Sequence, residues 1–376
     1  MKVYHFIYSF FYFLKQAFRK RHYQIIFYAP HHFNRGKNVE NLFFNELFKI
    51  CQSQGISYLY LEEPDLYSNQ RRSRIAIPFD FIYYLVILLR KFMGSEMSYI
   101  EIDKKIGVFV KKILLRRITF DNYITISQSM LSFFSGIDND AKQFDLQHGT
   151  IHARKESYLN DGLVSRNLKE NDTHLLLSGV AYKGLLTQNE KENYFHDHTE
   201  VIGTSMFSES NANTSNPNKN VLVSLQFTHD HSESENQKIA STLEKFIKKE
   251  PSFHFYLRNH PRFNNEIDLD RFLSFSNVSL ISGDLLDNLS KCALHLTTYS
   301  TTVFAAALQG VPTCFLYSDS PKMNIFGSQY NYPFYKTSLT EFYNNYSFFS
   351  LQVKDWVKEF YQPLNKDSFL KTLKNV

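Results

Sequence analysis

Residues 293–317, ALHLTTYSTTVFAAALQGVPTCFLY, contain a complete strand, helix and strand pattern. The apolar run at 293–297 has the length of a buried strand, and residues 300–309 predict a helix that Gly310 ends. Residues 312–317 predict the next strand. Strands that alternate with helices imply a parallel, doubly wound sheet, so this segment predicts an α/β protein.

The same alternation extends outward from this segment in both directions. In the second half of the chain, strands are predicted at 221–227, 253–258 and 278–281, and helices at 232–249 and 284–292. In the first half, strands are predicted at 24–28, 56–61, 123–126, 143–147, 175–177 and 200–202, and helices at 39–52, 79–93, 104–117 and 127–134. The pattern therefore predicts two Rossmann-like domains, each built on a doubly wound parallel sheet.

A polar segment rich in Ser and Asn separates the two halves, and it cannot bury enough surface to form an element of its own. We expect a first domain at 1–204, a linker at 205–220, a second domain at 221–350, and a helical tail at 351–376 that packs back towards the first domain. Two sheets joined in this way are expected to face a central cleft.

Composition and charge narrow the class of protein. The chain is 43% hydrophobic and 21% charged, which excludes a disordered protein. The net charge of +5 comes from spread basic residues, so we expect no nucleic-acid partner. The cysteines Cys51, Cys292 and Cys314 form no CxxC pair, which indicates a reducing, cytoplasmic location.

Two apolar runs raise the question of a membrane. Residues 6–14 and 79–93 are both shorter than the roughly 20 apolar residues that span a bilayer. Each run suits either a buried helix or a helix that lies on a membrane surface, and the sequence leaves both alternatives open. Because Lys15, Arg19, Lys20 and Arg21 follow the first run, we expect a peripheral location on the inner-membrane surface.

Three motifs follow predicted strands, which is where ligands bind in open α/β sheets. The first is Asp145-Leu146-Gln147-His148-Gly149-Thr150. Gly149 is expected to let the backbone turn sharply, so that the His148 imidazole projects as a general base. Asp145 is expected to orient that ring.

The other two motifs lie in the second half. Residues 258–262, RNHPR, place a histidine between two arginines and predict a cationic phosphate site. Residues 297–302, TTYSTT, open a predicted helix, where hydroxyls and free backbone N–H groups suit an anion. The residues expected to bind the donor phosphate are Arg258, His260, Arg262, Ser300, Thr301 and Thr302. Each motif alone also fits a turn or a helix cap, and their ordered occurrence at strand ends favours a site.

Weaker candidates follow other strands. Thr228-His229-Asp230-His231 follows the first strand of the second half, and we expect Thr228 and His229 to line the cleft. Two further segments follow predicted strands, namely 62–65 (EEPD) and 35–38 (RGKN). Each fits either the acceptor side of the cleft, where Glu63 is the candidate residue, or an ordinary loop. The His-Asp-His triplets at 196–198 and 229–231 have no third ligand nearby, and residues 138–140, DND, suit a turn, so no metal is expected.

The ordered motifs between about 144 and 317 resemble those of GT-B enzymes. They are similar to the motifs of CDP-glycerol glycerophosphotransferases of teichoic acid synthesis, capsular Kdo transferases and bacterial polysialyltransferases. The resemblance implies that His148 is the catalytic base and that His260, Ser300 and Thr301 hold the donor phosphate. It also implies that domain 1–204 holds a glycan or lipid-linked glycan acceptor, and that domain 221–350 holds a nucleotide-sugar donor without a further cofactor.

This chain departs from the glycerophosphotransferase pattern at two positions. Gln147 stands where those enzymes usually have Trp, and Thr298 stands where they have Asp. The Gln147-His148-Gly149 form favours a sugar transferase of capsule, O-antigen or lipopolysaccharide synthesis. A CMP-linked acid sugar such as Kdo or sialic acid is the favoured donor, with a UDP-sugar as alternative. A glycerophosphotransferase, a sugar-nucleotide epimerase and a non-catalytic scaffold of a polysaccharide-assembly complex are the rival functions.

Overall fold

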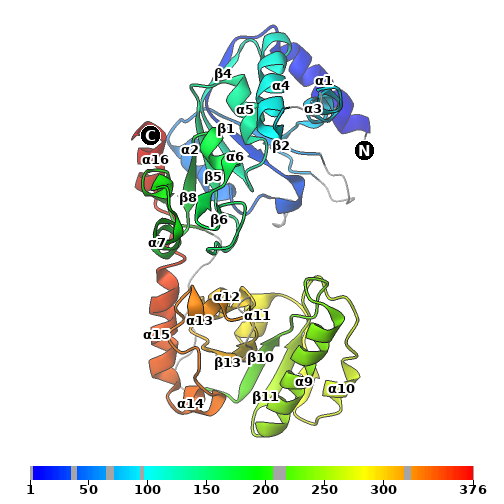
Figure 1. The fold of residues 1–376 in the computed structure, drawn as a ribbon, viewed down its shortest axis with the longest axis vertical. Coiled ribbons are helices and arrows are strands. Elements are labelled where there is room, and N and C mark those ends of the chain that lie inside the picture. Colours follow the sequence, from blue (N-terminus) through cyan, green and yellow to red (C-terminus); the bar gives the residue numbers. More distant parts are fainter. Residues whose placement is uncertain are drawn as a thin grey trace. The chain divides into compact units, whose positions relative to one another are not determined.

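The computed structural model describes residues 3–34, 40–64, 72–93, 97–205, 217–316 and 323–375. The chain divides into two compact units (Figure 1). The first comprises 1–206 together with 362–376, and the second comprises 207–361. Most of the segment expected to be a linker, 206–216, lies outside the described residues, as do Arg35–Asn38 and Asp65.

The first unit is built on a parallel sheet of seven strands in the order β3-β2-β1-β4-β5-β8-β9. The strands are β1 Arg21–Ala29, β2 Tyr58–Glu62, β3 Ile77–Pro78, β4 Ile118–Ile126, β5 Lys142–Leu146, β8 Thr173–Leu177 and β9 Thr199–Val201. A separate antiparallel pair joins β6 Leu159–Asn160 to β7 Leu163–Val164. The strand order reverses between β1 and β4, which makes their carboxyl ends a switch point of the sheet.

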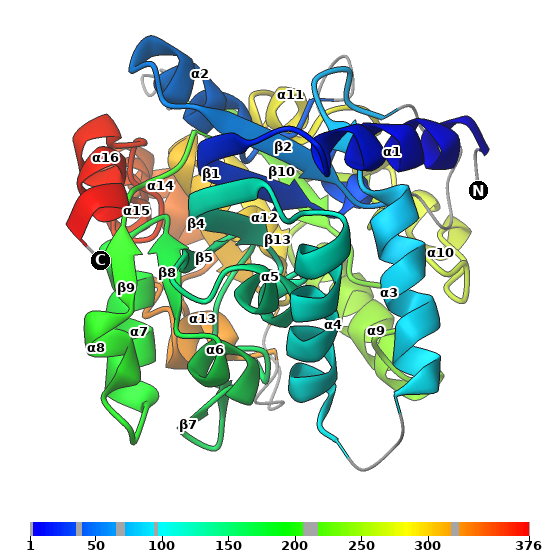
Figure 2. The ribbon, with the colours of Figure 1, turned by 90° about the horizontal axis from the view of Figure 1, so that it is seen from above.

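Helices cover both faces of this sheet (Figure 2). They are α1 Val3–Gln16, η1 His31–Phe33, α2 Asn45–Ser53, α3 Asp80–Phe92, α4 Tyr99–Ile113, α5 Leu131–Ile137, α6 Arg166–Glu170, α7 Val180–Asn189, α8 Tyr194–Asp197 and α16 Lys366–Asn375. Side chains alternate along β1, so Phe27 packs on Phe44 and Phe48 of the α2 region while Tyr28 packs on Phe134 of α5. Both faces are therefore hydrophobic, as a doubly wound sheet requires.

Helices α4 and α5 cross in backbone contact. A Cβ atom on Gly107 of α4 would lie 2.1 Å from the Phe133 carbonyl oxygen, and one on Gly136 of α5 would lie 2.1 Å from the Lys104 carbonyl oxygen. Only glycine permits so close an approach, so these two residues set the position of α4 on the sheet.

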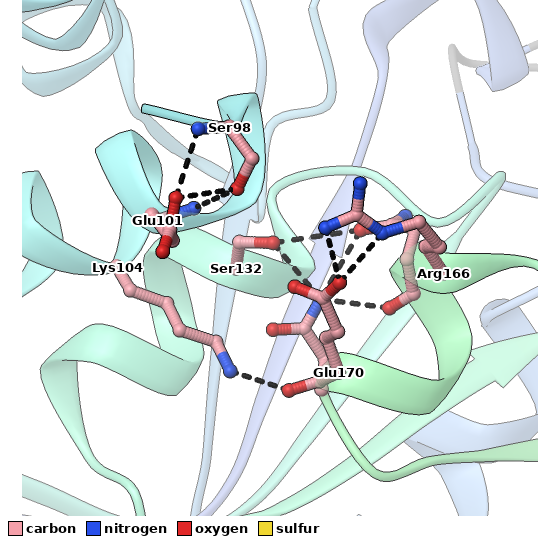
Figure 3. Close-up of polar contacts among 8 residues, drawn as sticks. Ser98, Glu101, Lys104, Ser132, Arg166 and Glu170 are labelled. Carbon is pink, nitrogen blue, oxygen red and sulfur yellow. Dashed lines mark hydrogen bonds and ion pairs between the residues drawn. The ribbon is translucent and has the colours of Figure 1, made fainter. Parts of the chain in front are cut away.

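Polar contacts attach α6 to the same pair of helices (Figure 3). The Lys104 ammonium donates to the Glu170 carbonyl, and the Asn171 side-chain amide donates to the Ser132 hydroxyl at 2.9 Å. Helix α4 begins with a capping box in which Ser98 and Glu101 satisfy each other's backbone N–H groups. Close backbone packing and hydrogen bonds therefore connect α4, α5 and α6 beside the carboxyl end of β4.

The second unit is built on a parallel sheet in the order β12-β11-β10-β13-β14. Its strands are β10 Asn220–Ser224, β11 His254–Arg258, β12 Val278–Leu280, β13 Leu294–Thr297 and β14 Thr313–Phe315. Its helices are α9 Glu233–Lys249, α10 Asp270–Leu273, α11 Leu285–Leu289, α12 Thr302–Leu308, α13 Ile325–Ser328, α14 Leu339–Asn344 and α15 Tyr346–Lys358. Here the strand order reverses between β10 and β13.

The predicted α/β class with two doubly wound parallel sheets is confirmed. The helix predicted at 127–134 is wrong in its first turn, because Ser127, Gln128 and Met130 have φ of 62°, 55° and 58° and the helix begins at Leu131. Left-handed backbone cannot continue a right-handed helix, and no glycine in the sequence announces this turn. Among the described residues, no helix combines the length and apolar character that a membrane span requires.

Candidate functional site

In the second unit, the loops that follow β10, β11 and β13 meet at one edge, because these strands are neighbours in the sheet. The His231 imidazole Nε2 lies 2.5 Å from the Tyr299 hydroxyl, which joins the β10 loop to the β13 loop. Arg262 forms a salt bridge with Asp230, with Nη1 3.1 Å from Oδ1, which joins the β11 loop to the β10 loop. The structure therefore brings the predicted 258–262 and 297–302 motifs into one connected surface.

The β11 loop presents one neutral and two charged groups. His260 Nδ1 accepts a hydrogen bond from the Arg262 backbone N–H at 3.0 Å, so the proton of the neutral ring lies on Nε2. Burial, followed by the nearby Arg262 charge, lowers the pKa of His260 and keeps the ring neutral. Arg258 is half-buried, and its Nε has no hydrogen-bond partner among the described residues. Asp230 pairs with Arg262, whereas Arg258 forms no ion pair with another described residue.

The hydroxyls at the start of α12 have different surroundings. The Thr302 hydroxyl donates to Ser224 Oγ at 3.0 Å and lies 3.3 Å from His295 Nε2, so it braces the ends of β10 and β13. Ser300 Oγ accepts from the Thr302 backbone N–H at 3.3 Å, and the Thr301 side chain is exposed. Thr301 is therefore open to a ligand, Ser300 is buried at 7% exposure, and the half-buried Thr302 already uses its hydroxyl to donate to Ser224.

The β10 loop contains residues that sequence reasoning underrated. Thr228 is buried, and its hydroxyl accepts from the Asp230 backbone N–H at 3.2 Å, so it shapes the loop. His229 is largely exposed and lies 3.7 Å from Glu266. The cross-loop contacts come instead from Asp230, His231 and Tyr299, whose roles depend on the neighbouring loops and have no local sequence signal.

In the first unit, His148 follows β5 beside the switch point. Its half-buried ring packs edge to face on Phe33, with ring centroids 5.1 Å apart. Burial, and then the charges of Lys155 and His32, lower the pKa of His148 to about 4. Nδ1 is buried without a hydrogen-bond partner among the described residues. The imidazole is therefore neutral at physiological pH and able to accept a proton.

Asp145 does not orient His148 in this structure, contrary to the sequence expectation. Its carboxylate accepts from the Gln128 backbone N–H at 2.7 Å, and the Tyr158 hydroxyl lies 3.5 Å away. Burial raises the pKa of Asp145 to about 7. The carboxylate thus supports the β4 turn, not the imidazole.

Gln147 and Gly149 fix the path and the surroundings of His148. The Gln147 side chain accepts from the Ser178 backbone N–H at 2.9 Å and donates to the Gly149 carbonyl at 2.8 Å. Gly149 is not in the left-handed region, and a Cβ there would meet no atom within 4 Å. The turn therefore does not require glycine, which corrects the sequence expectation. What glycine provides is open space beside His148.

Glu63 follows β2 and lines a pocket of about 410 Å³ within the first unit, apart from the residues that contact His148. Burial raises the pKa of Glu63. No group of three or more His, Cys, Asp or Glu side chains that could hold a metal ion occurs within the described residues.

Comparison with known proteins gives a clear result at the level of fold only. Neither a protein-family model nor a curated protein matches this sequence. UDP-GlcNAc 2-epimerase from Methanocaldococcus jannaschii matches with a TM-score of 0.54 and 12% identity, over 94% of this chain and 99% of that chain. UDP-GlcNAc 2-epimerase from Neisseria meningitidis, bound to UDP-GlcNAc, matches with a TM-score of 0.51 and 12% identity, over 94% and 99%. The glycotransferase of kitacinnamycin matches with a TM-score of 0.50 and 9% identity, over the same shares. The chain therefore has the two-domain GT-B fold.

Proposed function

We propose that this chain is a glycosyltransferase that moves a sugar from a nucleotide-activated donor to a growing capsule, O-antigen or lipopolysaccharide glycan. The supporting observation is the connected surface of the second unit, in which the Asp230–Arg262 and His231–Tyr299 contacts join three loops beside Arg258, whose Nε has no partner among the described residues. These loops follow strands at the switch point of the sheet, where α/β proteins bind ligands.

The proposed donor site uses a cation and neutral hydrogen-bond donors. Arg258, the His260 Nε2–H group and the Ser300 and Thr301 hydroxyls bind the donor phosphate. As the bond from the anomeric carbon to the phosphate oxygen breaks, its electron pair leaves with the phosphate, and these donors stabilise that charge. No residue in this scheme needs a metal ion or another cofactor.

His148 acts as the general base in this proposal. The acceptor hydroxyl attacks the anomeric carbon and passes its proton to the neutral imidazole. The low pKa of His148, about 4, keeps the ring unprotonated at neutral pH and also makes it a weaker base than an ordinary imidazole. The positive charge of Lys155 contributes to lowering this pKa, because it disfavours a second positive charge on the His148 ring.

The donor proposed first is a CMP-linked acid sugar, and a UDP-sugar is the alternative. The resemblance to capsular Kdo transferases and polysialyltransferases supports the former, while one of the similar structures is bound to UDP-GlcNAc. A glycerophosphotransferase that takes its donor from CDP-glycerol is the rival that also uses a cytidine nucleotide.

Epimerisation of a sugar nucleotide is the second candidate function, because two of the similar structures are UDP-GlcNAc 2-epimerases. The motif residues around the proposed donor site are mainly imidazole, guanidinium and hydroxyl groups. The carboxylate Asp230 of that surface is paired with Arg262, which favours transfer over epimerisation. Incubation of a UDP-sugar without acceptor separates the two, since only an epimerase changes the sugar.

The test is thermal stabilisation by CMP, CDP and UDP, since a ligand that binds only the folded state raises the melting temperature. We expect Arg258→Ala to remove the stabilisation and Arg271→Ala, whose guanidinium pairs with Glu244 at 2.6 Å, to retain it. His148→Ala should bind nucleotide but lose turnover. A chain that binds none of the three nucleotides is a scaffold, and the proposal is then wrong.

We also propose that helix α1 holds the protein on the anionic inner-membrane surface, where a lipid-linked acceptor resides. One face of α1 packs on α3 through Phe6, Phe10 and Phe81. The large apolar side chains left exposed in this region are Val3, Tyr4, Ile7, Tyr8, Phe11, Leu14 and Phe18. Basic residues follow directly at 19–21, which complements anionic lipid headgroups.

A further inference from the structure

The pocket that Glu63 lines lies wholly in the first unit, at the carboxyl ends of β2 and β4 and against α3, α4 and α6. Its volume of about 410 Å³ suits a small ligand. We infer that this pocket binds an uncharged sugar residue. The assignment of this sugar to the glycan acceptor rests on the proposed function. The inference that the pocket binds a neutral sugar does not.

The charges of the lining exclude an anionic ligand. The lining contains the carboxylates of Glu63 and Asp103 and the guanidinium of Arg90. Arg90 is already engaged by Asp103 in a bidentate pair, with Nε–Oδ1 and Nη2–Oδ2 both at 2.7 Å. Among the described lining residues, an anion therefore meets the Glu63 carboxylate and no cation without a carboxylate partner, which is unfavourable.

The same groups suit the hydroxyls of a neutral sugar. The Tyr83 side chain hydrogen bonds to the Glu63 carboxylate. A carboxylate has about four acceptor positions, so Glu63 can also accept from sugar hydroxyls. Tyr83 and Tyr99 add aromatic surface to the lining, against which the apolar C–H face of a pyranose ring can pack. Sugar hydroxyls that enter this pocket can donate hydrogen bonds to the Glu63 carboxylate, and burial of a polar group requires such a partner.

The floor of the pocket is preorganised. Gln128 Nε2 donates to the Ser157 carbonyl at 2.6 Å, and Asn167 Nδ2 donates to Gln128 Oε1 at 3.1 Å. Ser132 joins this group, because its hydroxyl donates to Asn167 Oδ1 at 3.4 Å and accepts from the Asn171 amide at 2.9 Å. This floor includes the turn in which Gln128 and Met130 adopt left-handed backbone. Non-glycine residues keep such strain where a site depends on it, which agrees with a binding role for the turn.

The experiment is saturation-transfer NMR on the full chain with three probes: methyl β-D-glucoside, methyl β-D-galactoside and the methyl glycoside of N-acetylneuraminic acid. We expect a response from at least one neutral glycoside and none from the anionic one. Tyr83→Phe and Glu63→Gln should each weaken binding about tenfold, the loss expected for a hydrogen bond that involves a charged group. Tyr84→Phe is the matched control, because the Tyr84 ring packs towards Phe6 of α1.

Three results would overturn the inference: no response from either neutral glycoside, an equal response from the anionic one, or full binding by both Tyr83→Phe and Glu63→Gln. Melting temperatures of the variants verify that they fold. Nucleotide stabilisation is measured on the same samples. Nucleotide binding without sugar binding rejects the pocket alone, and sugar binding without nucleotide binding rejects the transferase proposal alone.

Discussion

Gly149 gives the most direct test of the His148 region. A Cβ at this position would meet open space, and the backbone is not left-handed, so Gly149→Ala should leave the melting temperature unchanged. If substrate occupies the space beside His148, the added methyl group displaces it and kcat/KM should fall by about 10–100-fold. Steady-state kinetics with a donor and acceptor measure this effect.

Gly310→Ala is the control for that substitution. Gly310 has φ +70°, and a Cβ would lie 2.5 Å from Ser350 Oγ. This variant should lose at least about 1–2 kcal/mol of unfolding free energy from backbone strain alone. If Gly149→Ala instead behaves like Gly310→Ala, or retains full kcat/KM, the space beside His148 has no part in the reaction.

The pH dependence of kcat/KM reports the groups that titrate in the free enzyme. Because burial lowers the pKa of His148 to about 4, its base form persists down to about that pH, and the acid limb due to His148 should lie near pH 4. Asp145, with a pKa of about 7, is the group that would give a limb near neutrality, so Asp145→Asn separates the two. A limb near pH 6.5 that persists in Asp145→Asn would contradict the expectation.

The same shift predicts a change in stability. Burial lowers the pKa of His148 in the folded protein to about 4, whereas in the unfolded chain the imidazole keeps its ordinary pKa of about 6.5. As the pH falls from about 6.5 to 4, protonation therefore favours the unfolded chain, and the folded protein loses stability. The difference in urea midpoint between the wild type and His148→Asn should therefore change with pH in this window and be constant above it.

Several residue roles could not be read from the sequence, because they depend on partners distant in the chain. Gln147 matched a motif position, yet its side chain also accepts from the backbone N–H of Ser178, which directly follows β8. Glu62 was expected after a strand but is the last residue of β2, and its burial and its pairing with Arg72 at 3.3 Å were not foreseen. Local pattern identifies strand ends and the residue types on them; it does not show which side chains face one another.

Helix packing in the first unit depends on glycine at one crossing. Gly107→Ala would place a methyl group against the Phe133 carbonyl and force α4 away from α5. We expect a loss of about 1–3 kcal/mol of unfolding free energy, as overpacked sites show. Chemical denaturation followed by circular dichroism measures it.

Gly184→Ala in α7 is the matched control, because its Cβ would have no neighbour closer than 3.9 Å. Alanine is the better helix former, so this variant should gain about 0.5–1 kcal/mol. Equal effects of the two substitutions would show that the α4–α5 contact is not a determinant of stability.

For helix α1, the sequence predicted an apolar helix but not which of its faces would be buried. The apolar run and the basic residues after it were evident, but both a buried and an interfacial helix fitted them. The structure shows both features on one helix, with Phe13 buried and Phe11 61% exposed. Which face packs depends on α3, whose position the sequence of α1 does not contain.

The exposed face of α1 predicts vesicle binding. The protein should co-sediment with vesicles that contain phosphatidylglycerol, and less with pure phosphatidylcholine. Tyr4→Ser combined with Phe11→Ser should weaken binding at least about tenfold, since each buried aromatic side chain contributes roughly 1.5–3 kcal/mol. Phe348→Ser, which removes an exposed aromatic residue of α15, is the control and should bind normally. Binding that both variants retain would place the membrane contact elsewhere.

The division into two parallel-sheet domains could be predicted because strand and helix periodicities are local properties of the chain. The polar segment at 205–220 and the regular alternation after it were sufficient for that. The strand order, the small β6–β7 pair and the left-handed turn at 127–130 could not, because tertiary contacts determine them.

The carboxyl-terminal segment ties the end of the chain to the first unit. Residues 362–376 belong to that unit, and Phe369 of α16 is fully buried in its core with Phe27 and Leu146. The second unit has a separate core around Val221, Phe255 and Leu296. A defect at Phe369 should therefore weaken one unit and leave the other intact.

Phe369→Ala tests this by hydrogen exchange. Removing a buried phenylalanine costs about 3–5 kcal/mol, so amide protons of β1, β4 and β5 should exchange faster by the corresponding factor. Amide protons of β10, β11 and β13 should exchange at the wild-type rate, since their core lacks this side chain. Phe348→Ala, at a residue 56% exposed, should change neither set. Faster exchange in both sheets of Phe369→Ala would mean that the two cores unfold together, and that the chain acts as a single cooperative unit despite its two sheets.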